Sequence, residues 1–323
     1  MRAIIVTRLG GPEVLELSSA PLPEAAPGEV RVRLQAIGVN FADTERRRGI
    51  YATPQLPWTP GHEGAGVVDE IGEGVSPGLL GARVAFWSRA SSGAYAESVT
   101  VPVGDLFQFP APVSFAQMAA LPLQGLTAWG VVHLAARIKN GQNVLVHAAA
   151  GGVGRIAVQL AIAAGARVIG TGSSDAKLQA IGELGATPLA YGDEVPKRVR
   201  ALTRGRGADV VLDSVGRDTQ AASVAALAPF GTLVFFGEAS GAPIPIVVDD
   251  LYARSLRVGA FGLDTDAAPE AYANARQRLA AAVSDGSLKL AIAGTYPLAH
   301  AADAHTALES RATIGKVILE PAL

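Results

Sequence analysis

The feature that most constrains this chain is the stretch Asn143–Gly154, which reads NVLVHAAAGGVG. Its first five residues form an apolar run that predicts a short buried strand, and the apolar spacing that follows predicts a helix over Val153–Ala164. The turn between them is Ala148-x-x-Gly151-x-x-Gly154, with alanine where the commoner fingerprint has its first glycine. Glycines let phosphates approach the backbone, and a helix N-terminus offers N–H groups and a positive dipole. The stretch therefore favours a dinucleotide-binding turn over simple strand-to-helix packing.

The residues after this turn alternate between strand and helix patterns. Strands are predicted at Arg167–Thr171, Thr187–Tyr191, Ala208–Asp213 and Gly231–Phe236. Helices are predicted to begin at Ser174, Glu194 and Thr219. This alternation predicts a doubly wound parallel sheet with helices on both faces. Asp213 then ends a strand near the nucleotide, a place consistent with either a structural or a functional role.

The first 110 residues have a different pattern, with many glycines and prolines between short apolar runs. The strands predicted there are Ala3–Thr7, Glu29–Ala36, Gly66–Ile71, Arg83–Trp87 and Ala94–Thr100. Short strands separated by turn residues are typical of an irregular β-barrel. A helical pattern begins near Ser114 and continues past Pro122, and the last third of the chain predicts a helix over Pro269–Ser284 and a strand at Gly315–Leu319.

Length and composition limit the class of function. A chain of 323 residues accommodates two domains. A net charge of -2 gives no support for nucleic acid or an anionic membrane as the partner. With no cysteine, disulfides, thiolate metal sites and a cysteine nucleophile are excluded. The apolar run Ala3–Val6 is too short for a signal peptide, and no stretch approaches the roughly 18 apolar residues of a membrane span, so a cytoplasmic location is predicted.

The tip of the second predicted strand indicates which nucleotide binds. An acid near this place accepts a ribose 2′-hydroxyl, whereas a cation admits a 2′-phosphate. The tip reads Gly172, Ser173, Ser174 and contains no acid, while Lys177 follows one helical turn later. These residues favour NADPH. The alternatives are that the serines only cap the helix and that Lys177 lies on a solvated face.

The tripeptide Gly61-His62-Glu63 contains ligand types for zinc, but zinc is not expected. A catalytic zinc needs about three protein ligands, and the other histidines show no paired spacing with His62. Without cysteines the ligand set is incomplete, so His62 is predicted to be a packed or turn-stabilising residue.

Several motifs together resemble one family. They are AIGVNFAD at Ala36–Asp43, Arg47-x-Gly49-x-Tyr51, TPGHEGAGVV, GLTAW at Gly125–Trp129, the glycine turn, Ser174-x-x-Lys177, LGA at Leu184–Ala186, GADVVLDSVG and ESRATIGKVIL. In this order, the chain resembles the zinc-independent quinone oxidoreductases of the medium-chain dehydrogenase/reductase superfamily over almost its whole length. The resemblance implies a GroES-like catalytic domain (1–120 and 263–323), a Rossmann domain (121–262), NADPH and a homodimer.

The resemblance also implies which residues form the site. Asn40 and Thr127 are expected near the nicotinamide, and Gly151, Gly152 and Val153 at the pyrophosphate. The residues expected around the 2′-phosphate are Ser173, Lys177, Tyr191 and Arg311, and those expected to wall the site are Phe236, Gly237, Ser240, Phe261 and Gly262. Glu45 departs from the pattern, because the family often has an aromatic residue there, and this leaves the substrate lining open.

The chemistry expected of such a site needs little from the protein beyond orientation, a dry environment and a hydrogen bond to the oxygen that gains charge. Asn40 and Tyr51 are the candidates for that hydrogen bond; the alternatives are a turn asparagine and a packing tyrosine. The acceptor is predicted to be a conjugated carbonyl compound, first a quinone and second an enone or enoyl thioester. A third hypothesis is an NADPH-binding module with little turnover. The homodimer is expected to form at a sheet edge near Gly231–Phe236 and Leu256–Ala260.

Overall fold

The computed structural model describes residues 1–52, 55–89 and 93–321 and divides into two compact units. The first unit combines Met1–Leu123 with Ala268–Leu323, and the second is Gln124–Ala267. Within the described residues, no helix combines the length and the apolar character needed to cross a bilayer.

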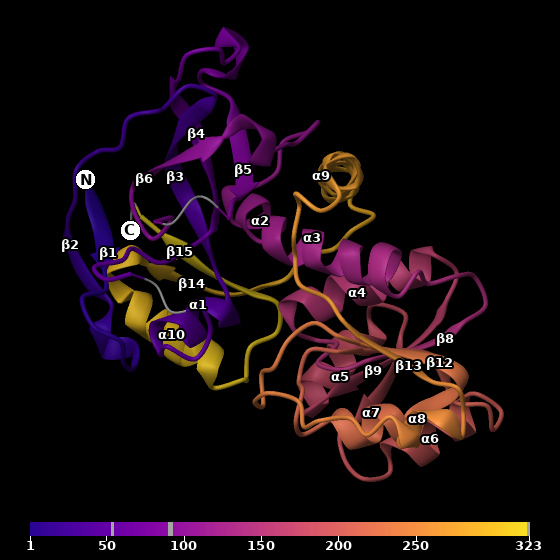
Figure 1. The fold of residues 1–323 in the computed structure, drawn as a ribbon. Coiled ribbons are helices and arrows are strands. Elements are labelled where there is room, and N and C mark those ends of the chain that lie inside the picture. The colour runs from indigo at the N-terminus through magenta and orange to yellow at the C-terminus, as the bar shows by residue number, and fades with distance from the viewer. Residues whose placement is uncertain (53–54, 90–92, 322–323) are drawn as a thin grey trace. The chain divides into compact units, whose positions relative to one another are not determined.

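The second unit is built on a six-stranded sheet in which every strand pair is parallel (Figure 1). The strands, in their order across the sheet, are β10 (Thr187–Ala190), β9 (Arg167–Gly172), β8 (Asn143–Val146), β11 (Ala208–Asp213), β12 (Leu227–Phe235) and β13 (Arg257–Ala260). The first strand in sequence, β8, lies in the middle, so the chain winds outward in both directions. This arrangement confirms the predicted doubly wound sheet.

Helices connect and cover these strands. They are α3 (Pro122–Trp129, which begins in the first unit), α4 (Gly152–Ala163), α5 (Asp175–Gly182), α6 (Val195–Leu202), α7 (Gln220–Ala226) and α8 (Asp249–Tyr252). Helix α4 packs on β8 and β9, α5 on β9 and β10, and α7 on β11 and β12. The apolar residues that the periodicity places on one helix face therefore pack against the sheet. The hydrophobic core of this unit forms around Leu145, Val211 and Leu233.

The first unit contains a larger, mostly antiparallel sheet. Its strands, in order, are β14 (Ile292–Pro297), β15 (Lys316–Glu320), β3 (Glu29–Val39), β4 (Glu63–Ile71), β5 (Arg83–Trp87) and β7 (Leu106–Gln108), with β6 (Ser98–Pro102) also paired to β3. A separate pair is β1 (Arg2–Ile5) and β2 (Glu16–Ser19). Strand β15 comes from the end of the chain and lies beside β3, so both ends of the sequence build this unit.

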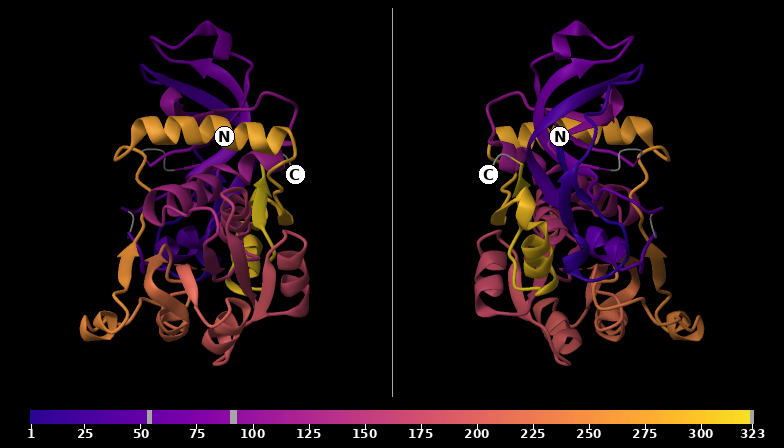
Figure 2. Two further views of the ribbon diagram at one scale, coloured as in Figure 1. Left: turned by 90° about the vertical axis from the view of Figure 1, so that its right-hand side faces the viewer. Right: turned by 90° about the vertical axis from the view of Figure 1, so that its left-hand side faces the viewer.

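Among the residues that the structure describes, four α-helices lie wholly within the first unit. They are α1 (Phe41–Arg47), α2 (Phe115–Ala119), α9 (Pro269–Ser284) and α10 (Ala301–Glu309). Helix α9, seen lengthwise and coloured orange in Figure 2, packs on β7, and Arg276 pairs with Asp105 there. Helices α1 and α10 lie side by side (Figure 1). Short 3₁₀ turns occur at Pro12–Val14, Pro77–Leu79, Val103–Asp105 and Leu298–His300.

Some predicted boundaries were wrong. Strand β6 begins at Ser98 rather than Ala94, and β12 begins at Leu227, four residues before Gly231. The helical pattern from Ser114 is interrupted after α2 and changes into a π-helix at Gly130–Ala135. Pro122 lacks a backbone donor, so it begins α3 rather than continuing α2.

A buried polar chain joins α1 to α10 in the first unit. Arg47, 1% exposed, donates from Nη1 to His305 Nδ1 at 3.0 Å and pairs with Glu309 at 2.7 Å. Because a guanidinium can only donate, Nδ1 must be the acceptor and Nε2 carries the proton that faces Tyr95 Oη at 2.9 Å. Burial and the Arg47 charge lower the pKa of His305 to about 3, so the ring is neutral in the folded protein.

We expect this histidine to make stability depend on pH. Its folded pKa lies below its unfolded value, so its contribution is present above about pH 6.5 and is lost as the pH falls. One proton changes the unfolding free energy by about 1.4 kcal/mol per pH unit. Urea unfolding between pH 6.5 and 4 should therefore show a shallower loss for His305→Gln than for the parent. His300→Gln, which changes an exposed histidine, is the control, and equal slopes for His305→Gln and the parent would contradict the assignment.

Candidate active site

Most of the predicted cofactor residues follow the carboxyl ends of the six parallel strands, which all lie at the same end of the second unit's sheet. The glycine turn follows β8, Ser173 follows β9 and Tyr191 follows β10. Phe236 and Gly237 follow β12, and Phe261 and Gly262 follow β13. In parallel sheets ligands bind outside this end, where the order of the strands reverses. Here the reversal lies between β8 and β11.

The glycine turn is shaped by close backbone contacts. Ala148 has a left-handed φ of 50°, a conformation that costs a residue with a side chain about 1 kcal/mol or more. A Cβ on Gly154 would collide with the Ala148 carbonyl, and one on Gly152 would collide with the side chain of Gln124. Gly151 caps α4, and Val153 lies in its first turn. At position 154 only glycine fits against the backbone, whereas at position 152 a side chain would have to displace the Gln124 side chain. The glycine at 154 keeps the start of α4 close to the turn, where its N–H groups suit an anion.

The predicted 2′-phosphate residues of the second unit form a small polar group. Lys177 Nζ donates to Ser173 Oγ at 3.2 Å, and Ser174 caps α5 by accepting the Lys177 N–H at 3.4 Å. Ser174 therefore caps the helix, as the alternative interpretation had it, while Ser173 faces the ammonium group. Partial burial lowers the pKa of Lys177. An anion beside Ser173 would offset that cost, so the group suits a phosphate.

Tyr191 contacts the glycine turn itself. Its hydroxyl accepts the Ala148 N–H at 2.7 Å, and its ring stacks on His147 with centroids 5.9 Å apart. His147 is fully buried, its Nδ1 meets Thr171 Oγ1 at 3.0 Å, and burial lowers its pKa. The stack holds the end of β8 against the tip of β10. Sequence reasoning missed this role of His147, since a histidine in an apolar strand gives no such signal.

The remaining predicted residues of the second unit are Ser240, on the connection after β12, Thr127 in α3, and Asp213, the last residue of β11. Ser240 Oγ donates to the Val215 carbonyl at 2.8 Å and accepts the Asp218 N–H at 3.0 Å. Thr127 is a buried residue of α3. Asp213 is also buried and accepts from the Val215 and Gly216 N–H groups and from the hydroxyls of Thr219 and Ser223. These contacts make Asp213 the structural support of its loop.

In the first unit, Asn40 lies between β3 and α1 and is 5% exposed. Its N–H donates to Asp43 Oδ2 at 2.9 Å, and its side-chain Nδ2 donates to Glu63 Oε1 at 2.7 Å. Its Oδ1 accepts from Lys316 Nζ at 2.6 Å. Burial raises the pKa of Asp43, with a smaller contribution from the charge of Glu63. Lys316 and Glu63 also pair with each other, and neither was predicted as a site residue.

The other predicted residues of the first unit are less enclosed. Tyr51 is 57% exposed on the segment after α1, and Glu45 lies half-buried in α1. Arg311 follows α10 with a left-handed φ of 57°. Since Arg311 belongs to the first unit and Ser173, Lys177 and Tyr191 to the second, its share in phosphate binding stays a prediction.

His62 has the packed role that the sequence predicted. Its Nε2 contacts Arg46 Nη1, its Nδ1 faces the Ser88 carbonyl at 3.3 Å, and the Arg46 guanidinium lies 5.3 Å from the Trp58 ring. Among the described residues there is no group of three or more His, Cys, Asp or Glu side chains that could hold a metal ion. The absence of zinc itself stays a prediction.

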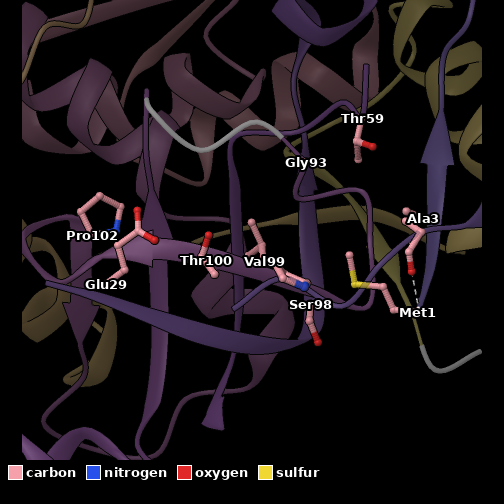
Figure 3. Close-up of a pocket in the computed structure, with 11 residues that line it drawn as sticks. Met1, Ala3, Glu29, Thr59, Gly93, Ser98, Val99, Thr100 and Pro102 are labelled. Atoms are coloured by element: carbon pink, nitrogen blue, oxygen red, sulfur yellow. Dashed lines mark hydrogen bonds between the residues drawn. The ribbon is translucent and has the colours of Figure 1, made fainter. Parts of the chain in front are cut away.

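A cavity of about 220 Å³ lies elsewhere in the first unit, between the N-terminus and β6 (Figure 3). Glu29, Ser98 and Thr100 are among the residues that line it. None of the predicted site residues is in its lining, so it adds nothing to the candidate active site.

Comparisons with known proteins define the class to which this fold and these residues belong. The model "Alcohol dehydrogenase GroES-like domain" matches residues 26–111, and "Zinc-binding dehydrogenase" matches 152–281. The second stretch contains no histidine and no cysteine. A GroES-like domain joined to a dinucleotide-type parallel sheet is the architecture of the medium-chain dehydrogenase/reductase superfamily.

Relatives over the full length narrow the class to a family. A quinone oxidoreductase of Pseudomonas aeruginosa is 39% identical over 97% of both chains, and a 2-haloacrylate reductase of a Burkholderia species is 36% identical over 99% of this chain and 98% of its own. The structure of Escherichia coli quinone oxidoreductase complexed with NADPH has a TM-score of 0.93 and 37% identity, covering 99% of this chain and 100% of its own. The chain belongs to the quinone oxidoreductase family of this superfamily.

The grouping of Ser173 with Lys177 predicts a preference for NADPH over NADH. Charge-assisted contacts are worth roughly 1.5–3 kcal/mol, so Lys177→Ala should weaken NADPH binding by about tenfold or more. NADH, which lacks the 2′-phosphate, should lose little. Titration calorimetry with both nucleotides measures the two changes. Lys197→Ala, which removes an exposed lysine of the same unit, is the control, and equal losses of both nucleotides in Lys177→Ala would contradict the assignment.

Proposed function

We propose that this protein is an NADPH-dependent reductase that transfers a hydride to a quinone. The observation that carries the proposal is the similarity to quinone oxidoreductases at 38–39% identity over 97% of the chain. Solved relatives of the same length are complexed with NADPH. In this proposal the second unit binds the nucleotide, the first carries the catalytic side chains, and the protein works in the cytoplasm.

The residues of the second unit fit the nucleotide. Gly151, Gly152 and Val153 would hold the pyrophosphate at the N-terminus of α4, and Ser173 and Lys177 would hold the 2′-phosphate. Phe236, Gly237, Phe261 and Gly262, at the carboxyl ends of β12 and β13, would flank the rest of the nucleotide. When bound, NADPH supplies the hydride, and the protein supplies orientation and polarity.

The protein groups proposed to act on the acceptor are Asn40 and Tyr51. A hydrogen bond from the Asn40 amide or the Tyr51 hydroxyl to the reduced oxygen stabilises the charge that develops there. The hydride and a proton from water together convert a quinone to its hydroquinone. Because the chain has no cysteine and Arg46 occupies the lone pair of His62, the side chains offer a poor ligand set for a metal that would polarise a simple ketone. An acceptor that delocalises the incoming charge is therefore favoured.

A second candidate is reduction of a conjugated carbon–carbon double bond. The observation that favours it is the 36% identity to a 2-haloacrylate reductase over 99% of this chain. Half-buried Glu45, in place of the family's frequent aromatic residue, puts a carboxylate in α1 where the family often has a ring, so the acceptor would meet a different lining. An enone or enoyl thioester needs the same hydride donor and the same hydrogen bond to oxygen.

The test is NADPH oxidation with a panel of quinones and a panel of enones and enoyl thioesters. We expect turnover with quinones, and Tyr51→Phe should lower kcat while the affinity for NADPH stays nearly unchanged. Tyr296→Phe, which changes a half-buried tyrosine of β14 in the same unit, is the control. Turnover of enones alone would favour the second candidate. NADPH binding without turnover of either panel would overturn both and favour a nucleotide-binding module.

We further propose that the protein is a homodimer formed at the β13 edge of the second unit's sheet. β13 ends the strand order, while β12, also predicted near the edge, lies one strand inside. Beside this edge, Phe230 is 67% and Tyr252 73% exposed, and Val247 and Val248 are each 59% exposed. An apolar sheet edge of this kind favours a symmetric partner.

Charges placed on this surface should prevent dimerisation. Burying an unpaired carboxylate in an apolar contact is costly, so Val248→Glu and Tyr252→Glu should shift the protein toward the monomer mass of 33.0 kDa. Light scattering across a wide concentration range measures the mass. Leu80→Glu places the same charge on an exposed leucine of the first unit and should leave the dimer intact. A parent protein that stays at monomer mass throughout would overturn the proposal.

A further inference from the structure

Three strand ends of the first unit bring together residues that are far apart in the sequence. Asn40 follows β3, Glu63 begins β4 and Lys316 begins β15. Both β4 and β15 run antiparallel to β3 and pair with it on opposite sides, so their first residues lie beside its last. Glu63 is fully buried, and Lys316 is 1% exposed.

The contacts among these residues select one orientation of the Asn40 carboxamide. The Lys316 ammonium has only donors, so it requires the oxygen Oδ1, and the Glu63 carboxylate has only acceptors, so it requires Nδ2. Rotating the amide by 180° would set a donor against the ammonium and an acceptor against the carboxylate. Both contacts of the reversed amide are repulsive, and burial strengthens the repulsion.

The second carboxylate oxygen of Glu63, Oε2, is also held by a hydrogen bond. It accepts the N–H of Leu123 at 2.7 Å, in the first turn of α3, where a carboxylate is favoured by the helix dipole. Gly38, which lies two residues before Asn40 in β3, leaves the space for the Glu63 carboxylate. A Cβ on Gly38 would lie 2.5 Å from Glu63 Oε1 and 2.8 Å from Cδ.

We propose that Glu63 and Lys316 are positioning residues that hold the Asn40 amide so that it presents an N–H to the acceptor oxygen. The inference rests on the proposed function, in which Asn40 contacts the acceptor. Glu63 and Lys316 take one N–H and one lone pair of the amide, and the second N–H of Nδ2 remains beyond these contacts. A donor held in advance of the reaction needs no reorganisation when charge develops on the oxygen.

The decisive variant is the double substitution Glu63→Gln with Lys316→Met, which removes both buried charges together and so leaves no unpaired ion. The oxygen of the new carboxamide then accepts the Leu123 N–H, which leaves its NH₂ group to face Asn40. A donor at this place favours the reversed Asn40 amide. We expect kcat with a quinone to fall at least tenfold, toward the value of Asn40→Ala, while the NADPH dissociation constant changes less than threefold.

Three further variants separate positioning from folding. Gly38→Ala displaces Glu63 without removing a polar atom and should also lower kcat. Val317→Ala, a buried β15 neighbour of Lys316, should lower the melting temperature and leave kcat unchanged. In an Asn40→Ala background the double substitution should cause no further loss of kcat. An added loss there of the same size as in the parent would overturn the inference, because Glu63 and Lys316 would then act independently of Asn40.

A measurement without turnover keeps the two proposals distinguishable. In protein labelled with ¹⁵N-asparagine, the side-chain resonance of Asn40 is assigned by its loss in Asn40→Ala. We expect it to shift strongly in the double variant and in Gly38→Ala but not in Val317→Ala. An unchanged resonance in the double variant overturns the positioning inference, whatever the activity. If the resonance shifts but Asn40→Ala keeps the full kcat, the role of Asn40 in the proposed function fails instead.

Discussion

The buried carboxylate of Glu63 is the interaction on which the proposed site of the first unit depends. Burying a charge costs several kcal/mol unless hydrogen bonds and an opposite charge compensate it. Here Lys316, the Asn40 amide and the Leu123 N–H supply them, and they come from three separate parts of the chain. Strands β3, β4 and β15 and the start of α3 must therefore all be in place before the carboxylate is satisfied. The contacts that compensate the Glu63 carboxylate and those that orient the Asn40 amide therefore depend on the same strand pairings.

The second unit positions its polar groups by a different physical rule. Its strands are parallel, so all six carboxyl ends lie at the same end of the sheet, and the connections that follow them begin there. The strand–turn–helix pattern behind this arrangement is local and periodic, which is why the sequence predicted these strands and turns well. The apolar run Asn143–His147, the glycines and the Ser173–Lys177 spacing each belong to one strand–turn–helix unit. Strand β11 was predicted at its observed bounds, and the ends of β8, β9 and β10 within one residue.

The predictions that failed, and the residues that were missed, involve contacts between distant segments. The start of β12 at Leu227 depends on pairing with β11, and that of β6 on pairing with β3, neither of which a local pattern contains. Glu63 drew notice in the sequence only as a ligand type for zinc, and nothing in a local pattern links it to Lys316, 253 positions away. Nothing in the sequence indicated that position 38 must be glycine. The space that Gly38 leaves is filled by the Glu63 carboxylate, which comes from another strand. Local periodicity predicts helices and strands, but the burial of a charged side chain such as Glu63 can be understood only from the residues that contact it in the fold.

Contacts with distant residues also define the roles of His62 and Glu63, the two zinc-ligand types of the tripeptide Gly61-His62-Glu63, in a chain without cysteine. A zinc ligand must offer a ring-nitrogen lone pair, but Nε2 of His62 faces the Arg46 guanidinium, which can only donate. Nδ1 then carries the proton toward the Ser88 carbonyl. Glu63, next in sequence and the first residue of β4, pairs with Lys316 instead. In this structure the guanidinium of Arg46 and the ammonium of Lys316 are thus the cationic groups that contact His62 and Glu63.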